Sequence, residues 1–181
     1  MSFFVLNNCC CVIPLFGDIN SVSLFQNIIV GSVGNGVSVN NVSNLKAFNN
    51  TIYNISGNSI VFSNNSEFEG TINSSEIRNN IFAGMVHVDD KINNESEGNI
   101  FSHNIYYNPL DENSENPLFV RPYSKFTEEL WTFCYSIGEC GDFHLQGDSP
   151  AVDTGYDVGF TSDFDGQGIV GAIDIGAYEY Q

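Results

Sequence analysis

Short runs of β-branched and aromatic residues alternate with clusters of asparagine along the first two thirds of the chain. Examples of these runs are Ser59–Phe62, Gly84–Val88 and Ile100–Tyr107. Short runs with this composition are typical of β-strands. Because no stretch of this region shows a convincing helical period, the pattern predicts short strands joined by tight corners.

The asparagine clusters return at a regular interval. Four asparagines align in successive repeats, at spacings of 23, 30 and 24: Asn27, Asn50, Asn80 and Asn104. In the same register, Gly34–Val37 returns one repeat later as Gly57–Ile60, and Leu6–Cys10 resembles a still earlier copy. A β-rich period in the low twenties indicates a solenoid, and the leucine ladder of leucine-rich repeats is missing here.

Asparagine suits the corners of such a solenoid for two physical reasons. It tolerates the left-handed backbone region better than other non-glycine residues, and its amide satisfies backbone groups at a bend. Amides stacked at the same corner of successive coils would also bond to one another along the axis, as in an Asn ladder. The sequence therefore predicts a parallel β-helix of about four to five coils, roughly 20–25 Å long.

The asparagines also mark a boundary in the chain. All of them lie between Asn7 and Asn116, and residues 117–181 contain none. We therefore expect β-helix coils over residues 1–116 and a C-terminal cap over residues 117–181. A solenoid exposes a strand edge at each end. No cap-like segment precedes the first repeat, so we expect that its first coil is frayed or covered by a partner, or that further coils precede Met1.

The C-terminal region contains a series of short motifs. In order, these are Pro117-Leu118-Phe119, Asp142-Phe143-His144-Leu145, Ser149-Pro150-Ala151-Val152-Asp153-Thr154-Gly155, Asp163-Phe164-Asp165-Gly166 and Asp174-Ile175-Gly176-Ala177-Tyr178-Glu179-Tyr180. The series closely resembles the end of bacterial pectin-lyase-like proteins of the choice-of-anchor Q group. One departure is the segment Arg121–Cys140, which is longer than the usual link in that group.

The resemblance implies an all-β fold, the right-handed single-stranded parallel β-helix with a C-terminal cap region. It also implies a secreted or cell-surface protein in a polysaccharide-handling setting, and several members of the wider class are polysaccharide lyases or hydrolases. Met1–Phe16 is apolar, but it has no basic start and Asn7 and Asn8 interrupt it, so it predicts a strand instead of a signal peptide. No sorting signal follows the last motif, and we identify no anchor.

Charge narrows the range of partners. The chain has 22 acidic and five basic side chains, for a formal net charge of −17, and residues 1–66 carry only Asp18 and Lys46. Such a surface repels phosphate backbones, which argues against nucleic acid as a partner. The composition also argues against a membrane span. Cys134 and Cys140 are close enough to form a disulfide in an oxidising compartment.

Candidate catalytic residues are few in the predicted coils. A polyuronate lyase needs a cation beside the substrate carboxylate and a base, and Arg78 and Lys91 are the candidates. A glycoside hydrolase needs two carboxylates about 5–10 Å apart, for which Asp89 is a candidate, with His87 one strand step away on the same face. The alternative is that all four are solvated groups on the outer face.

Candidate binding residues lie in both regions. Four aromatic side chains would either stack on sugar rings or fill the core and cap: Tyr106, Tyr107, Tyr123 and Trp131. The loop containing Asp163 and Asp165 would suit a loose calcium site, but Thr161 and Ala172 stand where an EF-hand needs acids. Aspartates in such loops more often cap turns through the backbone.

The sequence thus predicts a secreted or surface β-helix segment that is non-catalytic and contacts polysaccharide or serves a structural role. The alternative is a calcium-assisted polysaccharide lyase or a glycoside hydrolase of the pectin-lyase-like class. A third hypothesis is a structural fragment whose active coils lie in a missing N-terminal part.

Overall fold

The computed structural model describes residues 13–30, 36–63, 73–88, 98–108, 111–122 and 141–181. These residues form ten strands and, within these ranges, no helix. The strands are β1 (Ile13–Phe25), β2 (Ile28–Val30), β3 (Val37–Phe48), β4 (Thr51–Ser63), β5 (Glu76–Arg78), β6 (Ile81–Val88), β7 (Ile100–Ser102), β8 (Ile105–Tyr107), β9 (Phe119–Pro122) and β10 (Gly141–Leu145). The all-β fold that the sequence predicts is confirmed.

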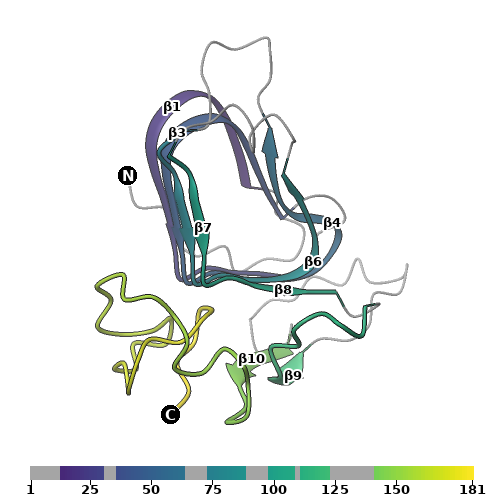
Figure 1. Cartoon of the computed structure of the whole chain (residues 1–181), viewed down its shortest axis with the longest axis vertical. Helices are drawn as coiled ribbons and strands as arrows, with labels where there is room; N and C mark the ends of the chain where they lie inside the picture. Colours follow the sequence, from purple (N-terminus) through teal and green to yellow (C-terminus); the bar gives the residue numbers. More distant parts are fainter. Residues whose placement is uncertain (1–12, 31–35, 64–72, 89–97, 109–110, 123–140) are drawn as a thin grey trace.

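Strands β1 to β8 form one sheet in which every pairing is parallel (Figure 1). One ladder runs through β1, β3, β5 and β7, and a second runs through β2, β4, β6 and β8. A third joins the first parts of β1 and β3 to the later parts of β4 and β6. The long strands bend at corners, so each contributes to two ladders.

The chain returns to each ladder at the interval that the sequence repeat predicts. Phe25 pairs with Phe48, Phe48 with Arg78, and Arg78 with Ser102, so the steps between partners equal the spacings of the aligned asparagines. Val37 pairs with Ile60, as the repeated glycine–asparagine motif before each of them indicates. A second, two-stranded sheet pairs β9 with β10 in antiparallel orientation.

The second ladder is apolar on both faces and separates two cores. Since side chains alternate along a strand, neighbouring residues of β2 point to opposite sides. Ile29 belongs to the core enclosed by the ladders, and Ile28 belongs to the core beneath the C-terminal region. In β6 the same division places Phe82 inside and Ile81 outside. This explains why these strands lack the polar alternation of a half-exposed sheet.

The described part of the C-terminal region lies along the side of the sheet (Figure 1). Its apolar side chains Phe143, Ile175 and Tyr178 join one cluster with Ile28 of β2 and Ile105 of β8, the first and last strands of that ladder. The sequence predicts that residues 117–181 form a C-terminal cap. Their described contacts cover the side of the sheet, because the outer face of the second ladder is itself apolar and needs burial.

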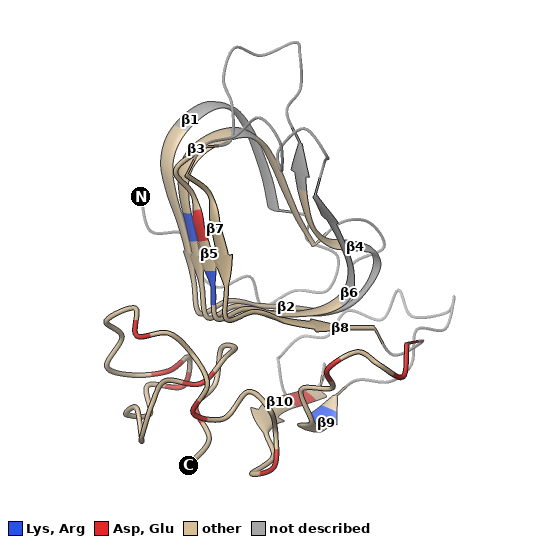
Figure 2. Cartoon of the chain, viewed as in Figure 1, with Lys and Arg blue, Asp and Glu red and all other residues tan. Residues whose placement is uncertain are grey.

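The acidic side chains gather on this region. Figure 2 shows most of the red Asp and Glu positions on the C-terminal segment, whereas the described sheet carries few charges of either sign. The charge asymmetry of the sequence therefore corresponds to two spatial parts of the molecule.

Candidate functional site

The four asparagines aligned by the repeat form a hydrogen-bonded column inside the corner between the first and second ladders. Nδ2 of Asn27 donates to Oδ1 of Asn50 at 2.8 Å, Asn50 donates to Asn80 at 2.8 Å, and Asn80 donates to Asn104 at 2.9 Å. Each accepting oxygen also takes the backbone N–H of the asparagine before it, at 3.0, 3.0 and 2.9 Å. The column thus pairs both backbone and amide groups at a corner where strand pairing is interrupted.

The residue before each column asparagine makes the turn. The backbone is left-handed there, with φ values of 52°, 54°, 57° and 53° at Gln26, Asn49, Asn79 and His103. From the sequence, we expected the same asparagines to supply both the left-handed geometry and the ladder bonding. In the structure two neighbouring residues share these roles. The left-handed residue turns the chain, and the asparagine after it points its side chain into the core and forms the column bonds.

A second corner repeats this arrangement and was missed from the sequence. Left-handed residues stack there as well: Ser21, Asn44, Ser74 and Gly98. The following residues again accept backbone N–H groups from the repeat before them. Ser75 Oγ accepts from Leu45 at 3.1 Å, and Asn99 Oδ1 accepts from Ser75 at 3.0 Å. The signal lay in the spacings among Asn44, Ser74 and Gly98, which equal those of the column asparagines.

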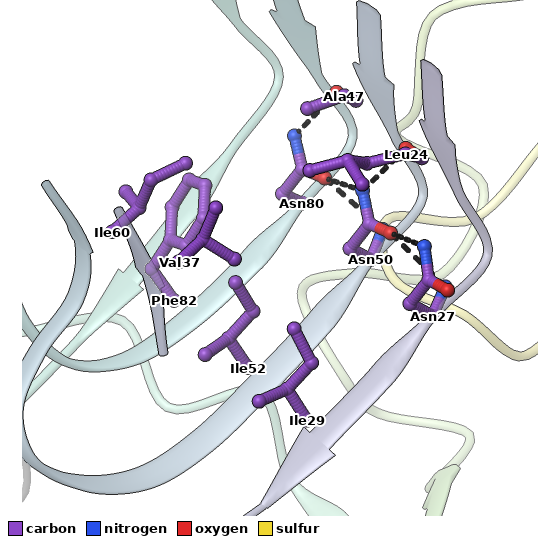
Figure 3. A pocket seen from close by; sticks show the side chains of 10 residues that line it. All are labelled: Leu24, Asn27, Ile29, Val37, Ala47, Asn50, Ile52, Ile60, Asn80 and Phe82. Atoms are coloured by element: carbon purple, nitrogen blue, oxygen red, sulfur yellow. Dashed lines mark hydrogen bonds between the residues drawn. The ribbon is translucent and has the colours of Figure 1, made fainter. Parts of the chain in front are cut away.

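The cavity inside the ladders is part of the core. Figure 3 shows Asn27, Asn50 and Asn80 along one side of it, with Ile52 and Phe82 opposite. Its volume is about 10 Å³, close to the smallest space that holds one water molecule. It therefore has no room for a sugar or another organic ligand.

Arg78 contacts three other side chains of the protein. Its Nε lies 3.0 Å from Glu76 Oε2, its Nη1 donates to Ser102 Oγ at 2.7 Å, and its guanidinium lies 4.3 Å from the centre of the Tyr156 ring. The Arg78 side chain is 12% exposed. Lys91 and Asp89 lie outside the described residues, as does the side chain of His87. The described residues therefore bring no second catalytic candidate to Arg78.

Of the aromatic candidates, Tyr106 and Tyr107 are described, and both belong to β8. Tyr106 is 44% exposed and its ring lies 5.6 Å from that of Phe82, tilted by 31°. Burial raises the pKa of the Tyr106 phenol. Tyr107 is half-buried against the core under the C-terminal region. The other two candidates, Tyr123 and Trp131, and the cysteines Cys134 and Cys140 lie outside the described residues.

The two aspartates proposed for calcium have protein partners. Asp163 Oδ1 accepts the N–H of Gln167 at 2.7 Å and its Oδ2 accepts the N–H of Glu179 at 3.1 Å. Asp165 Oδ2 lies 3.2 Å from Nε2 of His144. Within the described ranges, no group of three acidic, histidine or cysteine side chains is arranged to hold a metal ion. The observed bonds fit the turn-capping alternative.

His144 joins two of the sequence motifs. Its Nδ1 lies 2.7 Å from Asp142 Oδ1, its Nε2 faces Asp165, and its ring stacks on Tyr178 with centroids 3.9 Å apart. Burial acts to raise the pKa of Asp142, but the hydrogen bonds from His144 outweigh it and the pKa is lowered. His144 thus links β10 to the loop around Asp165.

Two buried carboxyl groups near the C-terminus were not singled out from the sequence. Asp174 is 1% exposed, and its oxygens accept the N–H groups of Asp153 at 2.6 Å and Tyr180 at 2.7 Å. Glu179 is 3% exposed. Burial, followed by the nearby charge of Asp174, raises the pKa of Glu179 to about 7. The closing motif contains both residues, but their burial depends on the docking of this segment.

Comparison with known proteins adds no family to these observations. No family model matches the chain, and neither a curated protein nor a solved structure matches it. Among the described residues, no helix has the length and apolar character needed to cross a membrane.

Proposed function

We propose that this chain is a right-handed single-stranded parallel β-helix of about four to five coils, related to the choice-of-anchor Q group of pectin-lyase-like proteins. The parallel ladders, visited in a fixed order at the interval of the sequence repeat, support the helical path. Connections between parallel strands of one sheet are right-handed in nearly all proteins, which supports the hand. The five C-terminal motifs support the relationship.

The function that we propose is a non-catalytic, extracellular one, in which the rod contacts polysaccharide or forms part of a surface structure. The observation that carries this proposal is that the polar side chains at the corners form hydrogen bonds and contacts with other residues of the protein. Asn50 and Asn80 bond along the column, and Asn79 and Arg78 bond or pack against the C-terminal region. Side chains committed in this way hold a scaffold together and leave little for chemistry on a substrate.

Tyr106 is the residue that we propose for polysaccharide contact. Its ring rests on Phe82 and is 44% exposed, and β8 is the last strand of its ladder among the described residues. An exposed aromatic face fixed by a second ring offers apolar area to the C–H face of a sugar at little entropic cost. Further coils before Met1 would extend the rod at its other end.

A binding assay tests this proposal. The purified chain is titrated with a panel of neutral and acidic polysaccharides, and Tyr106→Ala is compared with Tyr180→Ala. Tyr180 is a matched control because it is 43% exposed and lies in the C-terminal region. We expect Tyr106→Ala to weaken binding about tenfold, as for the loss of one aromatic contact, and Tyr180→Ala to leave it unchanged. Equal effects, or no binding by the parent chain, would contradict the proposed contact.

The same panel tests the enzymatic alternative. Each polysaccharide is incubated with the chain in calcium and in chelator, and unsaturated-uronate absorbance and new reducing ends are followed together. Calcium-dependent absorbance would establish a lyase, and reducing ends alone would establish a hydrolase. Either result would replace the non-catalytic proposal. Retained binding without either product supports it.

A further inference from the structure

The C-terminal region contacts all four repeats at the corner that holds the asparagine column (Figure 1). The left-handed residue of each repeat takes part: Gln26, Asn49, Asn79 and His103. In the first repeat, Gln26 Nε2 donates to the carbonyl of Ser162. The neighbouring ring of Phe25 meets that of Phe160 edge to face, with centroids 5.4 Å apart.

The second repeat is bonded to the last part of the region. Asn49 Nδ2 donates to the carbonyl of Asp174 at 2.8 Å. Thr51 Oγ1 accepts the N–H of Ala177 at 3.1 Å. Both bonds join positions more than a hundred residues apart in the sequence.

The third and fourth repeats share a contact with Tyr156. The amide of Asn79 exchanges two hydrogen bonds with the backbone of Tyr156, each 2.8 Å long. The carbonyl of Asn79 also accepts the N–H of Gly176 at 2.8 Å. In the fourth repeat, the ring of His103 lies 5.6 Å from that of Tyr156.

The residues that make these contacts are also bonded to one another. The N–H of Gly155 donates to the carbonyl of Ile173 at 2.8 Å, and a Cβ at Gly155 would lie 2.6 Å from that oxygen. The N–H of Phe164 donates to the carbonyl of Ala177 at 2.9 Å. These bonds join the part that contacts the first, third and fourth repeats to the part that contacts the second and third. Residues 155–177, which we call the strap, are thus one internally bonded unit.

The strap adds a kind of contact that the ladders do not provide. Where each repeat pairs only with its neighbours, the repeats at the two ends open more readily than those in the middle. The second corner shows this simpler case, since the described bonds from Leu45 to Ser75 and from Ser75 to Asn99 each join neighbouring repeats. A single unit bonded to all four repeats instead links repeats that do not touch each other.

We propose that the strap docks and undocks as one unit, and that it thereby couples the first of the four repeats to the last. The device is conformational: loss of one contact weakens the docking of the strap at all four repeats. The docked strap holds the two end repeats, each of which has a neighbouring repeat on only one side among the described residues. This inference goes beyond the proposed function and does not depend on polysaccharide binding.

Amide hydrogen exchange in the parent chain measures the undocking. The amides of Tyr156, Gly176 and Ala177 are bonded to two different repeats. Their protection factors are measured by NMR in increasing urea below the unfolding transition. Because the strap is released as a whole, we expect one common free energy of opening and one common urea dependence. Separate urea dependences for Tyr156 and Ala177 would contradict the proposal.

Two variants test the coupling between repeats. Gln26→Met removes the hydrogen bond to Ser162 in the first repeat and keeps the length of the side chain. We expect the protection of Tyr156 and Gly176, two repeats away, to fall by the same factor, about fivefold, as for one hydrogen bond. Thr51→Val removes the acceptor of Ala177 in the second repeat, and the same loss is expected at Tyr156.

Asn20→Ala is the matched control. Asn20 lies in the same repeat as Gln26, and its Oδ1 accepts one hydrogen bond at the second corner, from Asn44 Nδ2 at 2.6 Å. We expect this variant to leave the protection of Tyr156 unchanged. Two results would overturn the proposal: unchanged protection of Tyr156 in both Gln26→Met and Thr51→Val, or an equal loss in Asn20→Ala, which would mean that the strap opens only when the whole fold unfolds.

Discussion

The side-chain amide of Asn79 pairs with the backbone of Tyr156 as one strand pairs with another. Nδ2 of Asn79 donates to the carbonyl of Tyr156 at 2.8 Å, and Oδ1 accepts the N–H of Tyr156 at 2.8 Å. Asn79 is also a left-handed corner residue, with φ of 57°. One residue thus turns the chain at this corner through its backbone and binds a distant part of the chain, the C-terminal region, through its side chain.

Asn79→Gly separates these two roles. Glycine relieves left-handed strain worth about 1 kcal/mol. It also removes three side-chain hydrogen bonds, the two with Tyr156 and one from Asn79 Nδ2 to Asn49 Oδ1 at 3.1 Å, which together cost about 3 kcal/mol. We therefore expect a net loss of global stability of about 2 kcal/mol and faster amide exchange at Tyr156. His103→Gly is the control, because His103 has φ of 53° and makes a ring contact with Tyr156 without an amide pair. A stability gain in Asn79→Gly would contradict the role of the amide.

Asn80→Ala tests the internal column. Asn80 Oδ1 accepts two bonds from Asn50, and Asn80 Nδ2 donates to Asn104 and to the carbonyl of Ala47. The truncation leaves buried groups unpaired on both sides, and we expect a loss of about 3 kcal/mol in the free energy of unfolding measured by denaturant titration. The exposed Asn113→Ala should change stability by no more than about 0.5 kcal/mol. Equal effects of the two variants would show that the column contributes nothing specific.

Gly176→Ala tests the fit of the C-terminal segment. A Cβ at Gly176 would lie 2.7 Å from Ile81 Cδ1, and φ is +110°. Gly159 shares a positive φ, +84°, but a Cβ there meets nothing within 4 Å. We expect Gly159→Ala to cost about 1 kcal/mol from backbone strain and Gly176→Ala to cost at least about 2 kcal/mol because of the added clash. Thermal unfolding that ranks the variants in the reverse order would refute the close packing.

Arg78→Met tests whether Arg78 is structural. Methionine keeps the apolar stem but loses the ion pair with Glu76, the hydrogen bond to Ser102 and the contact with the Tyr156 ring. We expect a stability loss of about 2 kcal/mol, since each of the three interactions is worth about 0.5–1 kcal/mol near a surface. Lys46→Met, at an exposed position in register with Glu76, removes the same charge and should change stability by less than about 0.5 kcal/mol.

The link between Asp142 and His144 predicts a response to acid. The pKa of Asp142 is lowered from its ordinary 3.8 because the hydrogen bonds from His144 outweigh the effect of burial. An acid with a lowered folded-state pKa stabilises the fold above its ordinary value, and that contribution disappears as pH falls below 3.8. In His144→Gln we expect the Asp142 midpoint to rise in a ¹³C carboxyl titration. An unchanged midpoint would contradict this assignment.

The repeat is the part of the structure that the sequence determined. Residues that recur once per repeat must meet their counterparts in the neighbouring strand, so the spacing of Asn27, Asn50, Asn80 and Asn104 fixed the strand register without further information. The column bonds follow from that register. The change in composition after Asn116 likewise separates the ladders from a region with different contacts.

Only the tertiary structure decided where the C-terminal region lies and what its polar groups do. Its contacts join residues far apart in sequence, such as Thr51 and Ala177 at a separation of 126 positions. The sequence repeat does not predict such pairs. Burial of Glu179 depends on this docking, and so does the engagement of Arg78 by Tyr156. Each residue of a repeat pairs with its counterpart in the next repeat, so the repeat alone predicts these contacts. A single long-range contact depends instead on the shape and chemistry of two surfaces that form only when the chain folds.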